Sequence, residues 1–350
     1  MKASSILGLN ARTKLYSYRY NKVHGRRIAR SKLLTKKYLK RAGVPIPAML
    51  AKFKEPQDIF DFDWNSLPDS FALKPSKGLG GAGIVVAKRR DKEDKSRWIS
   101  VKRERITIDD LKLHALDILE GAFSVDNSPD VAYIEEYVGR HKSLAKFAYR
   151  GTPDIRVIVF NKVPVMAMLR LPTRESGGRA NLHQGAIGVG VDIATGITTS
   201  AIWHGDFIQY KPGSKKRKLN GIKIPFWDEV LLTAVKCQEA TQLGYVGVDV
   251  VLHPERGPMV LEVNSQPGLQ IQLCNKAGLN KRLARVDDLL VVSGEHGVRI
   301  AKALFGERFS LKVKSKDKQP VLKSAEEITL VDGYGKKVKV MAKVDTGAWS

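Results

Sequence analysis

The sequence has little cysteine and no long apolar run. Cys237 and Cys274 are its only cysteines, so a disulfide framework is excluded and an intracellular protein is expected. No apolar run approaches the ~20 residues that a membrane-spanning helix needs, and the basic N-terminus lacks the apolar core and cleavage site of a signal peptide. We therefore expect a soluble, cytoplasmic protein with no membrane partner.

Acidic residues are scarce beside basic ones. The 350 residues include 36 Asp and Glu against 60 Lys and Arg, which gives a formal net charge of +24. Such an excess attracts polyanions, so RNA, the ribosome and an acidic peptide or protein are candidate partners; a merely solvated basic surface is the alternative. The chain lacks the basic motif interleaved with aromatic residues that RNA-recognition domains carry, which argues against RNA binding as the main function.

The length and the helical patterns predict more than one compact unit. With 43% hydrophobic residues the chain can bury a substantial core, and two or three units are expected. Helical patterns cover 13–43, 58–62, 107–121, 226–243 and part of 286–304. Two charge-rich interruptions, 88–105 and 211–223, are expected to be exposed.

Two apolar segments rich in β-branched residues, 245–252 and 259–264, flank six residues rich in proline and glycine, which predicts a β-hairpin. If the turn is centred just after Glu255, Asp249 lies opposite Glu262, and Asn264 shares their face because strand side chains repeat every two residues. Buried carboxylates placed side by side are costly unless a cation lies between them, and oxygen ligands suit Mg²⁺. The hairpin therefore predicts a metal site for a nucleotide, the alternative being polar residues that face solvent from a half-exposed sheet.

A glycine-rich segment follows the apolar strand pattern 71–75 and precedes a second one, 84–87. Glycines let backbone N–H groups approach a phosphate closely, and Lys74 at the strand end adds a positive charge. The segment matches neither the Walker nor the Rossmann pattern, because no helix opens after it. It is either a phosphate-binding loop or a simple hairpin tip. Its candidate ATP-binding glycines are Gly78, Gly80, Gly81 and Gly83.

These features belong to eight blocks that, in their order, resemble the ATP-grasp superfamily and, more narrowly, the RimK-like α-L-glutamate ligase-related proteins. The resemblance covers about residues 6 to 305. The blocks are 6–12, 32–36 with 42–47, the Lys74 glycine loop, 134–138, 154–157, 168–173, 180–185 and 261–268. The resemblance implies an α+β ATP-grasp fold, in which two α+β lobes sandwich ATP together with one or two Mg²⁺ ions, for which Mn²⁺ can substitute.

The resemblance also implies domain boundaries. Residues 1–30 are a basic N-terminal extension, and residues 31–310 are the ATP-grasp domain. Its N-terminal lobe, about 31–135, carries the glycine-rich loop, and its C-terminal lobe, about 136–310, carries the metal site. The separate α/β domain that usually precedes this core in RimK-like ligases is not apparent, so a substrate-binding surface is expected to be missing or replaced.

Lys32 and Lys74 match the two lysines that contact phosphates in the family. Their alternative is solvated surface lysine, and Ser31, where the family often has an acidic residue, weakens the match of Lys32. The segment 133–138 resembles the strand between the lobes, whose backbone meets the adenine edge. In this resemblance the residues that frame the nucleoside are Glu135, Glu136, Tyr137 and Val138.

Arg156 and Arg170 lie on two apolar strand patterns, 155–161 and 163–171. An arginine in an apolar strand is costly unless it meets an anion, and its planar fork suits a phosphate or a carboxylate. We expect both to be catalytic residues that hold the γ-phosphate and the incoming carboxylate. Salt bridges to neighbouring acidic residues are the competing explanation.

The polar segment 174–185 contains two adjacent glycines, which is typical of a mobile loop that carries substrate contacts. Asn181 matches the family's residue near Mg²⁺ and the phosphates, and Arg179 is expected to assist it. His183 is a candidate substrate contact, although a lone histidine is more often structural. No second His or Cys stands at zinc-finger spacing from it.

The C-terminal tail has a basic linker, 312–318, and a strand pattern over 338–344 that leads into Asp345-Thr346-Gly347-Ala348. This tetrapeptide resembles the catalytic turn of retropepsin-like domains, which occur with RimK-like ligases. An aspartic protease needs two such aspartates. We expect 311–350 to be a linker and the truncated, inactive start of such a domain, unless the turn arises by chance.

Together these features predict an ATP-dependent carboxylate-amine ligase that adds glutamate, by analogy, or another amino acid to a peptide, a protein or a small acceptor through an acylphosphate. One alternative is a sugar-transfer-associated ATP-grasp enzyme of polysaccharide biosynthesis. Another, from a different class, is a basic RNA- or ribosome-binding protein with vestigial ATP binding. Salt-sensitive RNA affinity without ADP formation would favour the last.

Overall fold

The computed structural model describes residues 5–78, 80–124, 126–306, 325–331 and 337–343. The chain divides into two compact units, Met1–Glu307 and Arg308–Ser350. None of the helices in the described part of the chain has the length and apolar character that a membrane-spanning helix needs. The first unit contains all of the predicted site residues.

In the second unit, β14 (Ala325–Val331) and β15 (Lys337–Lys343) form an antiparallel hairpin. β15 confirms the predicted strand as far as residue 343. The predicted basic linker 312–318 and the predicted protease-like turn 345–348 lie outside the described residues.

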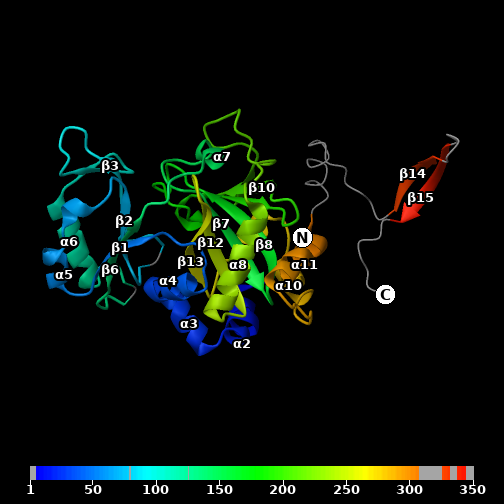
Figure 1. Cartoon of the computed structure of the whole chain (residues 1–350), viewed down its shortest axis with the longest axis horizontal. Helices are drawn as coiled ribbons and strands as arrows, with labels where there is room; N and C mark the ends of the chain where they lie inside the picture. Colours follow the sequence, from blue (N-terminus) through cyan, green and yellow to red (C-terminus); the bar gives the residue numbers. More distant parts are fainter. Residues whose placement is uncertain (1–4, 79, 125, 307–324, 332–336, 344–350) are drawn as a thin grey trace. The chain divides into compact units, whose positions relative to one another are not determined.

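The smaller sheet of the first unit has six antiparallel strands in the order β1-β6-β2-β3-β4-β5. Its strands are β1 (Met49–Phe53), β2 (Phe71–Pro75), β3 (Val85–Arg90), β4 (Trp98–Ser100), β5 (Arg105–Ile106) and β6 (Ala132–Glu136). Helices α5 (Pro56–Asp61) and α6 (Ile108–Leu119) lie on one face of this sheet and share a core with it (Figure 1). The glycine-rich segment connects β2 to β3, as the sequence pattern predicted.

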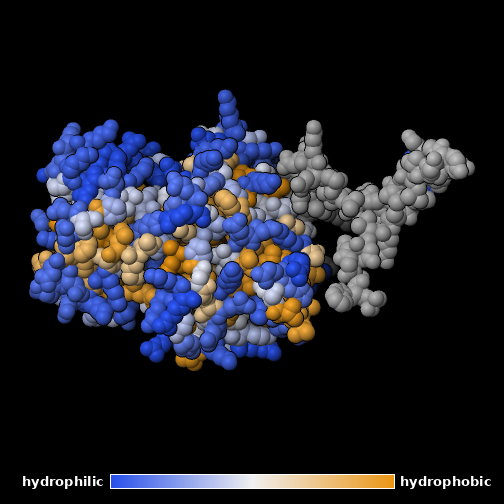
Figure 2. Space-filling model, viewed as in Figure 1, coloured by the Kyte–Doolittle hydropathy of each residue, from blue (hydrophilic) through white to orange (hydrophobic). Residues whose placement is uncertain are grey.

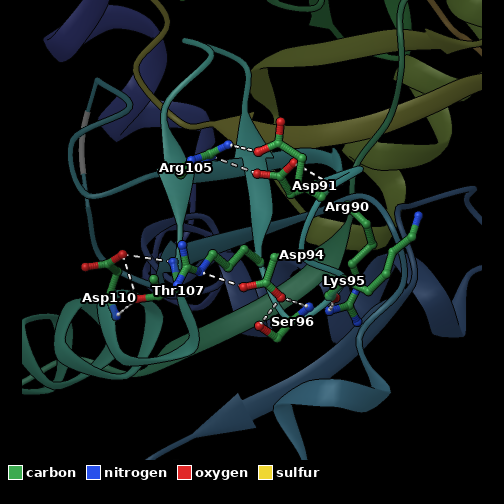
Figure 3. Close-up of polar contacts among 10 residues, drawn as sticks. Arg90, Asp91, Asp94, Lys95, Ser96, Arg105, Thr107 and Asp110 are labelled. Atoms are coloured by element: carbon green, nitrogen blue, oxygen red, sulfur yellow. Dashed lines mark hydrogen bonds and ion pairs between the residues drawn. The ribbon is translucent and has the colours of Figure 1, made fainter.

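The charge-rich segment 88–105 is ordered by polar contacts instead of forming one open loop. Arg105 Nε donates to Asp91 Oδ2 at 2.9 Å, and Asp94 Oδ1 accepts from the Ser96 N–H at 2.9 Å (Figure 3). These contacts connect β3, β4 and β5. Helix α6 then starts at a capping box, in which the Thr107 N–H donates to Asp110 Oδ2 at 2.8 Å.

The larger sheet has seven antiparallel strands in the order β11-β10-β9-β8-β7-β12-β13. Its strands are β7 (Asp154–Phe160), β8 (Val163–Leu171), β9 (Ile187–Val191), β10 (Thr198–Trp203), β11 (Asp206–Ile208), β12 (Tyr245–His253) and β13 (Gly257–Asn264). Every residue of β8 is buried, because both faces of the sheet are covered. This arrangement places β7 beside β12, which decides the site described below.

Helices and loops surround this sheet. The helical segments are α7 (Lys142–Ala145), α8 (Trp227–Thr241), α9 (Ile271–Cys274), α10 (Leu279–Ala284) and α11 (Gly294–Phe305), with the short 3₁₀ turn η4 (Leu182–Gln184); another such turn, η3 (Trp64–Ser66), packs in the core of the smaller sheet. α8 and α11 match two of the predicted helices, although α11 starts later because Ser293 caps it through the His296 N–H. Hydrophilic side chains predominate on the visible face of this unit (Figure 2).

The N-terminal helices pack their apolar side chains on the larger sheet, and the last of them also contacts the smaller sheet through the Lys36–Glu135 ion pair. They are α1 (Leu9–Ala11), the π-helix η2 (Arg12–Ser17), α2 (Tyr18–Tyr20), α3 (Val23–Arg30) and α4 (Lys32–Arg41). Leu7, Tyr16, Leu39 and Val44 belong to the core of the larger sheet. The structure therefore differs from the predicted boundaries: apolar side chains bind residues 5–30 and α4 into the lobe that was expected to begin near residue 136.

Candidate functional site

The hairpin of β12 and β13 places the predicted metal ligands together. Asp249 pairs with Glu262 and Gly247 pairs with Asn264, as the sequence predicted. The turn, however, pairs His253 with Gly257, so it is not centred as expected. One extra residue of β13 beside the Asp249 pair, a β-bulge, shifts the register by one and restores the predicted pairing.

Asp249 is bound by both predicted arginines. Arg156 donates from Nε to Oδ1 at 2.7 Å and from Nη2 to Oδ2 at 2.6 Å, and Arg170 donates from Nη2 to Oδ2 at 2.6 Å. Arg170 also makes a two-point ion pair with Asp154. Each arginine therefore has a carboxylate partner within the protein, as the competing explanation for these residues expected.

These charges set the protonation of the two buried aspartates. Burial alone would raise the pKa of Asp249, but the charges of Arg156 and Arg170 hold it below the ordinary value. For Asp154 burial outweighs the charge of Arg170 and raises the pKa to about 6. The cluster therefore keeps Asp249 ionised at neutral pH.

Lys32 connects the glycine-rich segment to the hairpin. Its Nζ donates to the Gly78 carbonyl oxygen and lies 3.8 Å from Glu262 Oε1. Ser31 caps the same helix, because its Oγ accepts from the Leu34 N–H at 3.2 Å. Ser31, which stands where the family often has an acidic residue, thus has a structural role at the start of α4.

Glu135 is buried between two lysines. Its Oε1 accepts from Lys74 Nζ, and its Oε2 lies 2.6 Å from Lys36 Nζ. Burial would raise the pKa of Glu135, but the charges of Lys74 and Lys36 hold it below the ordinary value. The Glu135 carboxylate therefore contacts lysines, where the sequence had predicted that it frames a nucleoside.

The other residues of the predicted adenine strand have protein contacts as well. The Glu136 carboxylate pairs with Arg256, and the Ala48 N–H donates to it at 3.2 Å. Tyr137 directly follows β6. The Val138 carbonyl oxygen accepts from Thr152 Oγ1 at 2.8 Å, and its buried side chain packs in a small cluster with Val251 and Met259.

The glycine-rich segment lies against the 174–185 loop. Gln184 Nε2 donates to the Gly80 carbonyl oxygen at 3.2 Å, and a Cβ added at Gly80 would lie 3.6 Å from Asn181 Nδ2. A Cβ added at Gly81 would lie 3.3 Å from Arg179 Cδ. The structure thus brings Asn181 and Arg179 to the predicted phosphate loop. The backbone of Asn181 and its neighbours forms η4, in which Asn181 Oδ1 accepts from the His183 N–H, and the His183 side chain is exposed.

Residues 11–288 match the family model described as sugar-transfer associated ATP-grasp. The chain belongs to this family. It has the α+β ATP-grasp fold predicted from the sequence, with two antiparallel sheets and flanking helices. The match names the group that was the alternative interpretation and not the RimK-like proteins. No curated protein matches the chain.

Solved ATP-grasp structures with low identity resemble the chain. An ATP-grasp ligase PsnB in complex with a minimal precursor is 15% identical, with a TM-score of 0.41 over 76% of this chain and 62% of PsnB. A D-alanine–D-alanine ligase from Bacillus anthracis in complex with ATP is 15% identical, with a TM-score of 0.39 over 85% of this chain and 71% of the ligase. A biotin carboxylase from Campylobacter jejuni is 13% identical, with a TM-score of 0.44 over 79% of this chain and 50% of the carboxylase. The chain thus spans about three fifths of the length of PsnB.

ATP-grasp enzymes use ATP and typically Mg²⁺, and the donor atoms of the hairpin fit this ion. Among the residues that the structure describes, Arg156 alone donates a hydrogen bond to Asp249 Oδ1, so this oxygen keeps a lone pair for a cation. Glu262 is 37% exposed at its side chain, and Asn264 Nδ2 is 3.5 Å from Asp249 Oδ2. In the described residues, no three His, Cys, Asp or Glu side chains converge as a full metal cage. Two carboxylates and an amide suit an ion that takes its other ligands from phosphates.

Three residues at this candidate site were not among the residues that the sequence analysis singled out. Lys36 lies one turn after Lys32 on the same face of α4, a spacing that could have revealed it. Gln184 follows the predicted residue His183, and Asp154 precedes the predicted strand 155–161. Nothing in the sequence indicates the partners of these two residues. Their pairings, with Gly80 and Arg170, join segments 104 and 16 residues apart.

Proposed function

We propose that the chain is an ATP-dependent carboxylate-amine ligase. In this reaction a substrate carboxylate oxygen attacks the γ-phosphorus of ATP and ADP leaves, which gives an acylphosphate; an amine then attacks the acyl carbon, and phosphate leaves as the amide forms. The position of Lys32 carries the proposal. It touches Gly78 of the glycine-rich loop and approaches Glu262 of the hairpin, so one cation links the proposed phosphate and metal sites.

The glycine-rich loop is the proposed phosphate cradle. Gly80, Gly81 and Gly83 have φ of 62, 81 and 69°, a conformation that side chains rarely adopt. Together with Gly78 their backbone N–H groups would bind phosphate oxygens, and Lys32 and Lys74 would supply positive charge. The adenine would meet the backbone of residues 135–138, because the Glu135 and Glu136 carboxylates are already paired with lysine and arginine side chains.

Asp249, Glu262 and Asn264 are the proposed ligands of Mg²⁺. When bound, the ion neutralises charge on the phosphates and favours transfer of the γ-phosphoryl group. Arg156 and Arg170 form ion pairs with Asp249 and hold its carboxylate in one orientation. Orientation of this kind is a general requirement of metal sites.

Arg156, Arg170 and Asn181 are the proposed catalytic residues. Arg156 binds Asp249 through Nε and Nη2 only, which leaves the two N–H groups of Nη1 to bind the γ-phosphate or the carboxylate substrate without loss of the ion pair. Asn181 lies beside Gly80, within reach of the same phosphates. Arg179 and the exposed His183 are proposed substrate contacts at the mouth of the site.

The substrates are a carboxylate and an amine, with glutamate as the amino acid by analogy. The description of the family, sugar-transfer associated, favours an acceptor linked to carbohydrate over a ribosomal or free peptide. An acidic acceptor would also be attracted by the net charge of +24. We therefore place the enzyme in the modification of a carbohydrate-linked acceptor.

The test is release of ADP and phosphate from Mg-ATP with pairs of one amino acid and one acceptor, followed by mass spectrometry of the products. The acceptors are acidic peptides and oligosaccharides that carry carboxylate or amino groups. Glu262→Gln is the test variant, and Glu255→Gln, exposed in the turn of the same hairpin, is its matched control.

We expect ADP release that requires one pair of substrates and a product heavier by the joined residue. Loss of a metal carboxylate should lower kcat/KM about 100-fold in Glu262→Gln, whereas Glu255→Gln should stay within about twofold of the wild type. Binding of Mg-ATP without turnover for any pair contradicts the ligase. If RNA affinity then survives Glu262→Gln and falls with salt, the binding-protein alternative is supported.

A further inference from the structure

Three consecutive backbone carbonyls after Asn264 accept hydrogen bonds from the N-terminal segment, residues 5–30. The Ser265 carbonyl oxygen accepts from Ser17 Oγ and from Asn21 Nδ2, each at 3.1 Å. The carbonyl oxygens of residues 266 and 267 accept from Arg12 Nη1, at 3.4 and 3.1 Å. The N-terminal segment thus binds three successive residues of the 265–268 loop, which directly follows the proposed metal ligand Asn264.

The same loop borders the proposed site. A Cβ added at Gly247 would lie 2.5 Å from Pro267 Cβ, and Gly247 is on the same face of β12 as Asp249. A Cβ added at Gly268 would lie 4.0 Å from Arg156 Nη1. This is the guanidinium nitrogen that does not bind Asp249. The loop therefore has the N-terminal segment on one side and the proposed substrate-binding arginine on the other.

Arg12 is the charged residue in this contact, and the packing of the segment does not require a charged side chain at this position. In the part of the chain that the structure describes, no acidic side chain forms an ion pair with it, and its Nε is buried without a hydrogen-bond acceptor. Burial of an unpaired N–H is unfavourable. Arg12 also begins a π-helix, a rare form that is frequent at functional sites.

The surroundings of Arg12 keep it in place. Tyr16 and Tyr20 pack edge-on against Phe160, with ring centroids 5.5 and 4.8 Å apart. Asn21 is buried and also donates to the Tyr245 carbonyl oxygen at 2.8 Å while accepting from the Tyr245 N–H at 2.9 Å. These contacts fix the segment to the start of β12, so Arg12 reaches the loop from a rigid support.

We propose that Arg12 is a positioning residue, which holds the 265–268 loop so that Arg156 receives the carboxylate substrate in one geometry. The inference rests on the proposed function, because it assigns the carboxylate site of that reaction to this loop. Arg12 acts through the loop carbonyls and does not touch the phosphates. Its loss should therefore affect the carboxylate substrate and leave ATP binding intact.

The experiment compares Arg12→Ala, Arg12→Lys and Lys14→Ala in the full chain. Lys14 is exposed on the same π-helix and serves as the matched control. Two readouts are independent of each other. The first is hydrogen exchange of peptides that cover residues 262–270, with residues 71–75 as reference, and the second is the KM of each substrate pair that supports ADP release.

For Arg12→Ala we expect about tenfold faster exchange across 265–270 and an unchanged reference peptide, because the loop loses two of its anchors. We also expect the KM for the carboxylate substrate to rise about tenfold or more, while the KM for ATP stays within about threefold. Arg12→Lys keeps the charge and one donor, so it should recover most of both effects, and Lys14→Ala should match the wild type.

Unchanged exchange in Arg12→Ala overturns the inference, whether or not the enzyme turns over. An equal rise in both KM values also overturns it, because this indicates general loosening of the site. If the wild type shows no turnover while Arg12→Ala exchanges faster in 265–270 alone, the ligase proposal fails and the anchoring of the loop stands. A variant that fails to fold leaves Arg12→Lys to decide between the same outcomes by exchange and KM.

Discussion

Arg156 and Asp249 form a two-point ion pair, with Nε 2.7 Å from Oδ1 and Nη2 2.6 Å from Oδ2. The pair joins β7 to β12 directly beside the proposed metal site. Arg170 adds a third donor from β8, so the carboxylate that is proposed to bind Mg²⁺ is also the centre of a buried charge cluster. We therefore expect Asp249 to contribute both to the stability of the fold and to catalysis.

Asp249→Asn should destabilise the fold as well as the site. The change leaves Arg156 and Arg170 with only Asp154 to balance them, and removal of one partner from a buried ion pair typically costs about 3 kcal/mol. Urea denaturation measures the free energy of unfolding. Asp288→Asn, at an exposed position, is the control and should change stability little. Equal stability of the two variants would show that the cluster does not support the fold.

Glu135→Gln should lower stability in a pH-dependent way. Lys74 and Lys36 hold the folded-state pKa of Glu135 below its ordinary value of 4.5, so its ionised form stabilises the fold above that pH and this contribution is lost as pH falls through the folded pKa. We expect a deficit of about 3 kcal/mol at pH 7, because two lysines remain unpaired, and a smaller deficit below pH 4.5.

The measurement for Glu135→Gln is the urea midpoint of wild type and variant from pH 7 downward. Exposed Glu104 supplies the control Glu104→Gln. A deficit that is constant across the pH range would mean that Glu135 does not titrate with folding as described.

Gly80→Ala should weaken ATP binding more than it weakens the fold. Gly80 has φ of 62° and faces Asn181 and Gln184, whereas Gly205 has φ of 91° and no atom within 4 Å of an added Cβ. Both substitutions to alanine should cost about 1 kcal/mol of stability from the backbone strain alone. Only Gly80→Ala should raise the KM for ATP, by about tenfold.

Thermal melting and ADP-release kinetics of Gly80→Ala and Gly205→Ala separate the two effects. A similar KM for ATP in both variants would place the glycine-rich segment outside the nucleotide site and make it a simple hairpin tip.

Removal of divalent cations should stop ADP release, and Mn²⁺ should restore it. The donors at the hairpin are oxygen atoms, which do not discriminate strongly between Mg²⁺ and Mn²⁺. Titration of each ion into the chelated enzyme gives the half-saturating concentration. Glu262→Gln should shift that concentration upward by about tenfold or more, because one anionic ligand is lost. Full activity in excess chelator would contradict the metal site.

The local patterns of the chain predicted the elements of the site well. The apolar, β-branched segments 245–252 and 259–264 around a segment rich in proline and glycine predicted the hairpin, and the glycines after Lys74 predicted the loop between two strands. Both are short-range features, because side-chain period and turn composition act within a few residues. The position of Asp249 opposite Glu262 was also predicted, although a β-bulge that the sequence does not reveal produces it.

Pairings between distant segments were not predictable in the same way. The sequence indicated that Arg156 needs an anion, but the order β7-β12 in the sheet selects Asp249, 93 residues away. Lys36 and Glu135 meet because α4 packs near the end of β6, and no local pattern encodes that contact. Residues 1–30 were predicted to be a basic extension, and only the packed core shows that Tyr16 belongs to the larger sheet.

The sequence by itself determined which chemical groups are available: two carboxylates and an amide on one face of a hairpin, a glycine-rich loop, and arginines in apolar strands. The tertiary structure decided which of these groups meet. It placed Arg12 at the 265–268 loop, 255 residues further along the chain at Pro267. The physical reason is that secondary structure follows from local periodicity and turn chemistry, whereas charge pairing depends on distances that only the packed sheets and helices fix.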